Sequence, residues 1–343
     1  MKQNVIVIFA PTASGKTALT KELFSLSGSH FVLNAEIISA DSQAVYKGMD
    51  IGTAKPDVDF CKLIPHHLIN LVNPDQQFNV ADFVELADKA CLEISNKNKC
   101  PVICGGTGFY IRNFLYGLPK TPESSPEVRK MVAEQLKEMG KEALYAQLSI
   151  IDPLSAKKIH PNDEYRICRA LEVFYSSGQT RSSFELNWQL RENYNFLFIV
   201  LEPPKDLLKK RIYDRVDYMF ANGLEEEVHN LISQGYDKSC PGMKAIGYSE
   251  FFKYRSREEI IMAIKSNSYK YAKKQFTYIR DIKGSQIIPF TASPQDIQRV
   301  SDLIKESIFF NSGVNKTPEN ERVKALSEAC LDRSYSHYQN LHF

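Results

Sequence analysis

The chain has 343 residues, enough for two ordinary domains or one elaborated α/β domain with a large core, and this length excludes a small disulfide-stapled fold. Hydrophobic residues make up 43% and charged residues 24%, the composition of a globular protein rather than of a disordered or membrane-embedded one. Lysine and arginine number 43 against 41 aspartate and glutamate, so the net charge of +2 indicates no particular class of partner.

Local sequence patterns exclude further classes of protein. No apolar run approaches the roughly 20 residues that span a bilayer, so no membrane partner is expected. The N-terminus leads from Met1 into a short apolar run with no small-residue cleavage site after it, which favours a cytoplasmic protein. The 7 cysteines show no paired C-x-x-C spacing of the kind that zinc sites use, so reduced thiols are expected.

Short β-branched runs alternate with helical patterns in the first part of the chain. Residues 5–9 form an apolar run without alternation, which is typical of a strand buried on both faces of a parallel sheet. Similar runs at residues 36–39 and 102–104 predict two further strands. The intervening segments predict helices at residues 17–24 and 81–94. This alternation indicates an open α/β sheet.

The middle of the chain has a different pattern. Between residues 117 and 195 the strand patterns vanish, and helical periodicity runs over 128–148 and again over 162–178. Strand patterns resume at residues 196–201 and 286–289, with helices between them. The expected organisation is a discontinuous core of residues 1–118 and 196–312, a helical insertion at 119–195, and a polar C-terminal tail at 313–343 with a short helix near 322–331.

The strongest single motif is Ala10-Pro-Thr-Ala-Ser-Gly-Lys-Thr17, which follows the first predicted strand and opens the first predicted helix. It resembles a P-loop, in which backbone N–H groups at a helix N-terminus bind phosphate oxygens. Lys16 adds a positive charge, and the Thr17 hydroxyl can hold Mg2+. Ala10 stands where the motif normally has glycine. The motif predicts a P-loop NTPase-like parallel sheet flanked by helices, and it leaves the reaction unspecified.

Further sequence blocks indicate which family of P-loop proteins the chain resembles. Three of them are Ser39-Ala-Asp-Ser-Gln-Ala-Val-Tyr46, Gly48-Met-Asp-Ile-Gly-Thr-Ala-Lys-Pro56 and Gly105-Gly-Thr-Gly-Phe-Tyr110. The other blocks are residues 65–68, 161–173, 223–228, 245–248 and 272–280. In this order and spacing they resemble the tRNA dimethylallyltransferase family, and the resemblance spans nearly residues 4 to 290.

The resemblance implies transfer of a dimethylallyl group from dimethylallyl diphosphate to N6 of the adenosine immediately 3′ to the anticodon, by a Mg2+-dependent enzyme that acts as a monomer on the anticodon stem-loop of tRNA. An aromatic amine is a poor nucleophile, so a base must accept its proton as the new bond forms. Asp41, at the end of a predicted strand, matches the family's catalytic aspartate. Thr107 is the second catalytic candidate, a hydrogen-bonding group near the transferring carbon or the target amine.

Departure of the diphosphate builds negative charge that needs stabilising. Lys16, the loop amides and Mg2+ at Thr17 meet that need, and Arg215 resembles the family's second diphosphate contact. The residues assigned to diphosphate or nucleotide binding are Ala10, Pro11, Thr12, Ala13, Ser14, Gly15, Lys16, Thr17 and Arg215, with Thr17 as the metal ligand.

The resemblance also assigns tRNA contacts. The target base must leave its stack to reach the P-loop, which is easy for an unpaired anticodon-loop nucleotide. Residues 265–283 hold six basic residues and one acidic residue, which favours a phosphate-rich partner and salt-dependent binding. The assigned residues are Asp41, Ser42, Gln43, Ala44, Thr107, Arg129, Tyr165, Arg166, Ile167, Cys168, Arg169, Lys244, Lys273, Lys274, Gln275, Thr277 and Arg280.

Four positions in or beside these contacts depart from the family pattern. Gln43 and Ala44 stand where arginine and glutamine are usual, Tyr165 replaces a glutamine, and Tyr278 replaces a tryptophan. These departures bear on how the base and the tRNA backbone are recognised.

Two alternatives remain open at this point. One is the related adenylate isopentenyltransferase, which makes cytokinins from free nucleotides, although the helical insertion and the basic stripe at 265–283 disfavour it because a mononucleotide needs no extended anionic track. The other is a P-loop ATPase module that binds RNA without prenylating it, and the family match at Asp41 and Thr107 disfavours this reading.

Overall fold

The computed structural model describes residues 2–119, 121–184, 189–279, 282 and 284–307. The expected C-terminal tail, its short helix and Arg280 lie outside the described residues. The chain divides into two compact units: unit 1 contains Met1–Leu115 and Arg191–Phe343, and unit 2 contains Tyr116–Leu190.

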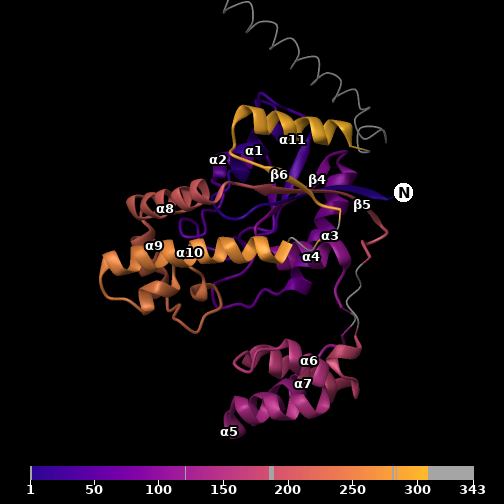
Figure 1. Cartoon of the computed structure of the whole chain (residues 1–343). Coiled ribbons are helices and arrows are strands. Elements are labelled where there is room, and N and C mark those ends of the chain that lie inside the picture. The colour runs from indigo at the N-terminus through magenta and orange to yellow at the C-terminus, as the bar shows by residue number, and fades with distance from the viewer. Residues whose placement is uncertain (1, 120, 185–188, 280–281, 283, 308–343) are drawn as a thin grey trace, which may run out of the picture. The chain divides into compact units, whose positions relative to one another are not determined.

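Unit 1 is built on one sheet of six parallel strands in the order β3-β2-β4-β1-β5-β6 (Figure 1). The central strand β1 pairs with β4, with Ile6 opposite Val102, and with β5, with Ile6 opposite Leu197. This arrangement confirms the predicted fold class. The strands are β1 (Gln3–Phe9), β2 (Ala35–Ser39), β3 (His66–His67), β4 (Cys100–Gly105), β5 (Tyr194–Glu202) and β6 (Gln286–Pro289).

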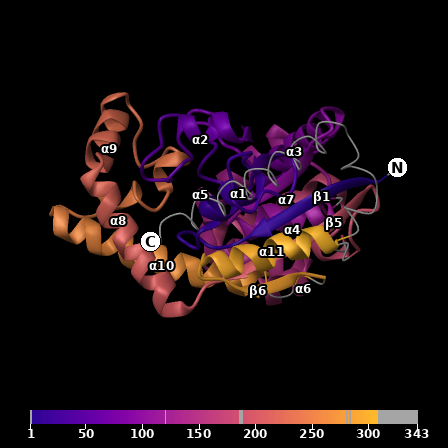
Figure 2. The same cartoon turned by 90° about the horizontal axis from the view of Figure 1, so that it is seen from above.

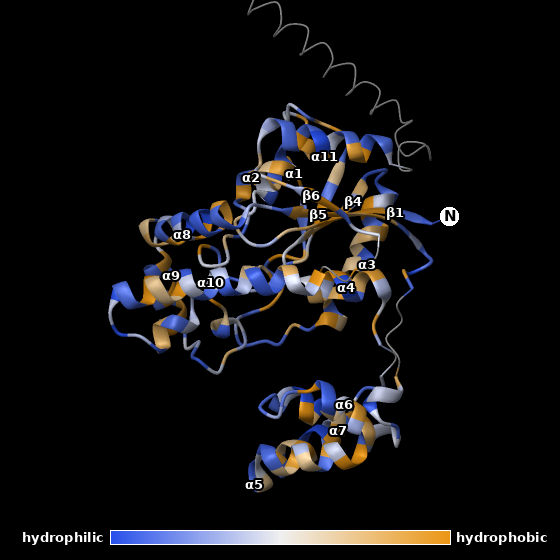
Figure 3. Ribbon diagram, viewed as in Figure 1, coloured by the Kyte–Doolittle hydropathy of each residue, from blue (hydrophilic) through white to orange (hydrophobic). Residues whose placement is uncertain are grey.

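Helices cover both faces of the sheet, so the central strands β1, β2 and β4 are mostly apolar and buried (Figure 3). On one face, α1 (Lys16–Phe24) and α11 (Pro294–Glu306) share a buried hydrophobic cluster with strand residues such as Ile8. On the other face, the Phe114 ring packs 5.9 Å from the ring of Phe196 in β5. That face carries α3 (Val80–Asn96), α4 (Gly108–Tyr116) and α10 (Arg257–Ile279).

The remaining described helices of unit 1 gather beside the carboxyl ends of the strands. Figures 1 and 2 show β1 running from the N-terminus toward the side on which α8 and α9 lie. Because ligands of parallel sheets bind at the carboxyl ends of the strands, these helices flank the place where a site is expected. They are α2 (Val58–Leu63), α8 (Lys205–Ala221), α9 (Leu224–Ser233) and the 3-10 helices η2 (Gly242–Lys244) and η3 (Ser249–Phe252).

Unit 2 is helical, with its own core formed by side chains such as Val132, Leu148 and Leu171. Its helices are α5 (Pro126–Ile151), α6 (Pro153–Lys158), α7 (Glu164–Ser177) and the 3-10 helix η1 (Arg181–Ser183). The unit spans residues 116–190, whereas the sequence pattern placed the insertion at 119–195, because Tyr194 and Asn195 already pair with β1 as the start of β5.

None of the described helices combines the length and the apolar character needed to cross a membrane. The six cysteines within the described residues are free thiols: Cys91 and Cys100 are buried, and the other four are half-buried.

Candidate active site

The loop between β1 and α1 has the geometry of a phosphate-binding loop. Gly15 caps α1 in the left-handed region, with φ 97° and ψ 14°, and a Cβ there would lie 3.0 Å from the Cβ of Ala292. A side chain at this position would be strained and crowded. Ala10 does not adopt a positive φ, which explains how alanine replaces the glycine usual at this position. Ala10 is fully buried, and its N–H donates to the carbonyl of Gly105 at 3.2 Å.

Lys16 holds its ammonium inside this loop. The Nζ donates to the carbonyl oxygens of Ala10 at 2.8 Å and Pro11 at 2.7 Å. Burial lowers the pKa of Lys16 to about 8, and Arg215 lowers it too, while Cys104 and Asp41 oppose the shift. The loop therefore contains a positive charge that the protein only partly compensates.

Asp41 and Thr107 lie together at the carboxyl ends of β2 and β4. The Thr107 Oγ1 accepts the backbone N–H of Ser42 at 3.0 Å and donates to the Ser42 Oγ at 3.3 Å. Asp41 Oδ1 accepts the backbone N–H of Gln43 at 2.9 Å, which fixes its carboxylate in the turn. The N–H of Thr107 also donates to the carbonyl of Ala40 at 3.0 Å, so the two loops are joined through the backbone.

Arg215 brings a second cation to this place from α8. Its Nη2 donates to the carbonyl of Thr53 at 3.3 Å. Burial lowers the pKa of Arg215, and the charge of Asp41 opposes this. The same aspartate opposes the burial shift of Lys16, so one carboxylate, two cations and the Thr107 hydroxyl converge from four elements of unit 1.

Two supporting residues near the site were not identified from the sequence. Arg211, one turn before Arg215, donates to the carbonyl of Ser14 at 3.4 Å and to that of Thr291 at 2.6 Å, and so braces the phosphate loop. Tyr271 on α10 interacts with the side chains of Thr107 and Gln275, and burial together with the charge of Asp41 raises its pKa. No sequence pattern distinguishes an arginine or a tyrosine with such a role from one that is simply exposed on a helix surface.

The basic stripe on α10 has two kinds of residue. Lys273, Lys274 and Thr277 are exposed, as is Lys244 on η2, and these side chains are accessible to a polyanion. Gln275 instead points inward and is buried, and its Nε2 donates to the carbonyl of Gly106 at 2.6 Å. Gln275 therefore holds the loop that carries Thr107, rather than lying on the surface with the lysines.

In unit 2 the assigned residues also differ in exposure. Arg129 and Tyr165 are exposed, and Arg166 is exposed while pairing with Asp163 at 3.0 Å. Ile167, by contrast, is fully buried in the core of the unit, so its side chain is not a surface contact. Cys168 is half-buried, and Ala44 in unit 1 is buried as well.

Arg169 binds the segment that leads into α5. Its guanidinium donates to the hydroxyl of Ser124 and to the carbonyl of Pro122 at 3.0 Å, and it pairs with Glu172 at 3.3 Å. Arg181 on η1, which the sequence motifs did not include, has its pKa lowered by burial and by the neighbouring charges of Arg166 and Arg169. Three guanidinium groups thus lie near one another in unit 2.

A phosphate loop after the central strand of a parallel sheet, with reactive side chains at the ends of the adjacent strands, defines the P-loop class of α/β proteins. Within that class, the family model described as IPP transferase matches residues 44–282. The chain belongs to this family.

Individual relatives agree with this assignment. A tRNA dimethylallyltransferase of Geobacter metallireducens is 40% identical over 292 residues, covering 84% of this chain and 92% of that protein. One of Acetivibrio thermocellus is 42% identical over 287 residues, covering 82% and 90%.

Solved structures agree as well. The tRNA delta(2)-isopentenylpyrophosphate transferase of Staphylococcus epidermidis is 35% identical with a TM-score of 0.62, covering 91% of this chain and 100% of that one. A eukaryotic dimethylallyltransferase acting on tRNA is 28% identical with a TM-score of 0.77, covering 91% and 80%.

Proposed function

We propose that this chain transfers the dimethylallyl group of dimethylallyl diphosphate to N6 of the adenosine immediately 3′ to the anticodon of tRNA, giving N6-isopentenyladenosine. The observation that carries the proposal is the convergence of Asp41 and Thr107 with Lys16 and Arg215 at the carboxyl ends of the strands. A carboxylate beside a cation-lined phosphate loop suits a reaction that releases diphosphate and a proton together. The names of the relatives, which act on tRNA, support the same substrate.

The residues divide the chemistry in the following way. The bond from N6 to the allylic carbon forms as the bond from that carbon to the diphosphate oxygen breaks, and the electron pair leaves with the diphosphate. Lys16, Arg215 and the N–H groups at the start of α1 stabilise the charge that develops on the leaving group. Asp41 accepts the proton from N6. Thr107, whose hydroxyl is held in place by Ser42, offers a hydrogen-bonding group that orients the reacting groups.

The described residues fit magnesium only as a partner of the substrate. They hold no group of three His, Cys, Asp or Glu side chains that could enclose a metal ion. Thr17 is exposed at the start of α1 beside Lys16, where its hydroxyl can complete a shell made mainly of diphosphate oxygens and water, the arrangement that Mg2+ prefers. When bound there, Mg2+ would neutralise charge on the leaving diphosphate.

Exposed cations support the proposed partner, and the cysteines support the proposed cellular setting. The exposed cations Lys273 and Lys274 on unit 1 and Arg129 and Arg166 on unit 2 suit contact with the anticodon stem-loop phosphates. Asp41, Thr107, Lys16 and Arg215 belong to one polypeptide, so the proposed reaction needs no residue from a second copy, and a monomer is the acting form that we propose. The free thiols among the described cysteines fit a cytoplasmic enzyme.

The test is transfer of label from radioactive dimethylallyl diphosphate to tRNA or to AMP by purified protein. We expect label in tRNA, and a nucleoside digest should place it in N6-isopentenyladenosine. Omission of Mg2+ should abolish the transfer. Label in AMP alone would refute the proposal in favour of an adenylate isopentenyltransferase, and tRNA binding without transfer would refute it in favour of an RNA-binding module.

A further inference from the structure

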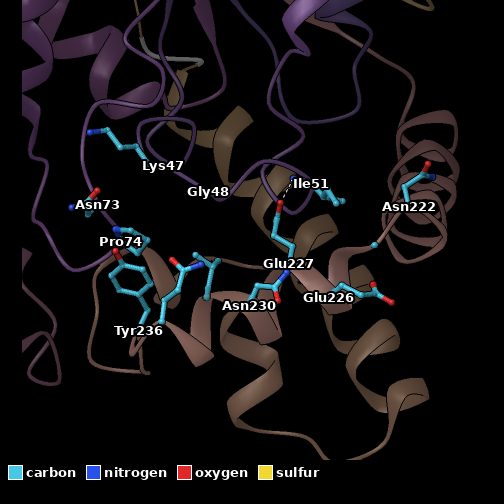
Figure 4. Close-up of a pocket in the computed structure, with 13 residues that line it drawn as sticks. Lys47, Gly48, Ile51, Asn73, Pro74, Asn222, Glu226, Glu227, Asn230 and Tyr236 are labelled. Atoms are coloured by element: carbon cyan, nitrogen blue, oxygen red, sulfur yellow. Dashed lines mark hydrogen bonds between the residues drawn. The ribbon is translucent and has the colours of Figure 1, made fainter.

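Three sequence blocks that the reaction does not use directly meet at one carboxylate. Glu227 on α9 accepts the backbone N–H groups of Asp50 at 2.9 Å and Ile51 at 2.8 Å through Oε2, and that of Gly52 at 3.1 Å through Oε1. The hydroxyl of Tyr248 donates to the same Oε1 at 2.6 Å. Glu227 thus makes four hydrogen bonds to residues far away in the sequence, and Figure 4 shows it directed toward Ile51 along the wall of a cavity of about 520 Å3.

The loop at residues 50–52 requires an anion of this kind. Its three consecutive N–H groups point to one place, which is the arrangement of a backbone anion nest. Gly52 allows the fully buried ring of Tyr248 to close the nest, because a Cβ on Gly52 would lie 2.6 Å from that ring. A carboxylate on a helix is the acceptor that the protein itself supplies. Glutamine at position 227 would place an N–H2 group against at least one of these donors.

The loop then leads directly to the reaction site. Thr53 follows the nest, and its hydroxyl donates to the carbonyl of Met49 at 2.6 Å. The carbonyl of Thr53 accepts the Nη2 of Arg215 at 3.3 Å. Arg215 is the cation whose charge acts on Lys16. The position of Thr53 therefore links the nest around Glu227 to the cations that face the diphosphate.

We propose that Glu227 is a positioning residue, which holds residues 50–53 so that the Thr53 carbonyl aims the Arg215 guanidinium at the diphosphate of the prenyl donor. This inference rests on the proposed function. It assigns to Glu227 an effect on the donor that is separate from its contribution to stability, since the effect passes through Arg215.

The test is a double-mutant cycle with Glu227→Gln, Arg215→Ala and the combined variant. We expect Glu227→Gln to lower kcat/KM for the donor about 10-fold while KM for tRNA stays within about 2-fold of wild type, because the loss is confined to the diphosphate end. In the Arg215→Ala background the same change should cost less than about 2-fold. Glu226→Gln is the matched control, because Glu226 is an exposed carboxylate of the same helix that lines the same cavity.

A second readout separates this inference from the proposed function. Calorimetric titration of the free protein with inorganic diphosphate needs neither tRNA nor transfer, and Glu227→Gln should weaken that binding about 10-fold. If wild type binds diphosphate and fails to prenylate tRNA, the proposed function is wrong and this arm still decides the role of Glu227.

Two results would overturn the positioning role. One is multiplication of the two losses in the combined variant, and the other is a Glu227→Gln protein that melts earlier yet binds diphosphate as wild type does. If Glu227→Gln does not fold, Tyr248→Phe removes one of the four hydrogen bonds. It should lower diphosphate affinity 2- to 4-fold in the wild-type background and have no effect in Arg215→Ala.

Discussion

The buried ammonium of Lys16 should lower the free energy of unfolding, and the substitution Lys16→Met tests this prediction. Burial lowers the pKa of its ammonium from 10.5 to about 8, so the folded state favours the neutral amine relative to the unfolded chain. A shift of this size disfavours the folded protein by about 3 kcal/mol at pH 7. The penalty is fully present below pH 8 and is relieved as the pH rises from 8 toward 10.5, so about 1 kcal/mol remains at pH 10.

Methionine has a similar length and no charge, so Lys16→Met removes this pH-dependent penalty. It also leaves the carbonyl oxygens of Ala10 and Pro11 without their donor, which costs stability at every pH. The sign of the difference at a single pH is therefore less informative than its slope. The free energy of unfolding of Lys16→Met relative to wild type should decrease by about 2 kcal/mol between pH 7 and pH 10.

Urea unfolding of both proteins at pH 7, 8, 9 and 10, without donor or Mg2+, measures this slope. Taking the difference at each pH cancels the titration of groups common to both proteins. Prenyl transfer should fall at least about 100-fold in Lys16→Met at pH 7, because the loop loses its charge for the leaving group. A stability difference that is constant from pH 7 to pH 10 would show that the ammonium is not buried at a cost, and the electrostatic reasoning would fail.

The remaining predictions concern the same site and one distant cluster. In wild type, kcat/KM for the donor should be constant below pH 8 and fall by up to about tenfold per pH unit above it, because only the charged form of Lys16 binds diphosphate well. A kcat/KM that stays constant up to pH 10 would contradict the pKa of about 8. Asp41→Asn should lower kcat about 100-fold or more and change inorganic diphosphate binding by less than about 3-fold in calorimetry, and transfer near the wild-type rate would remove the base assignment. Glu36→Gln should destabilise the fold by about 3 kcal/mol at pH 7 and by less than half of that at pH 3. The reason is that hydrogen bonds and charges lower the pKa of Glu36 from 4.5 to about 2, so the stabilisation is lost as the pH falls through this range. Equal losses of stability at both pH values in urea unfolding would contradict this prediction.

The central strands of the sheet were predictable because they are buried on both faces. The apolar runs at residues 5–9, 36–39 and 102–104 each lie inside an observed strand. The strand β3 was missed, since its two residues, His66 and His67, are too few to carry a pattern. The Nε2 of His67 instead donates to the Glu36 carboxylate at 2.7 Å, a contact between segments 31 residues apart.

The candidate site was predictable in part, because the carboxyl ends of parallel strands meet at one edge. This rule brings Asp41 and Thr107 to the phosphate loop without knowledge of any distance. It says nothing about side chains that helices deliver from elsewhere. Gln275 belongs to a motif that suggested a surface contact, yet it faces inward to Gly106. Glu227 reaches residues 50–52 across about 175 positions of sequence, and local patterns hold no information on such a pairing.

Two charged clusters on the sheet, one around Glu36 and one around Lys16, differ in whether the charged form of the central group is stabilised. Around Glu36, Lys97 at 3.2 Å, Lys99 at 2.9 Å and His67 at 2.7 Å stabilise the charged carboxylate, and its pKa falls. Around Lys16 burial exceeds the help of Asp41, and the pKa of the ammonium falls, which for a base means that the charged form is disfavoured. In both clusters two cations face one carboxylate, but Lys97 of the first is half-exposed to solvent, whereas burial lowers the pKa of both Lys16 and Arg215 in the second, where a diphosphate would balance their charge. In these two clusters a lowered pKa accompanies a stabilised charge on the carboxylate and a disfavoured charge on the lysine, and the second case supports an anion site at the carboxyl ends of β1, β2 and β4.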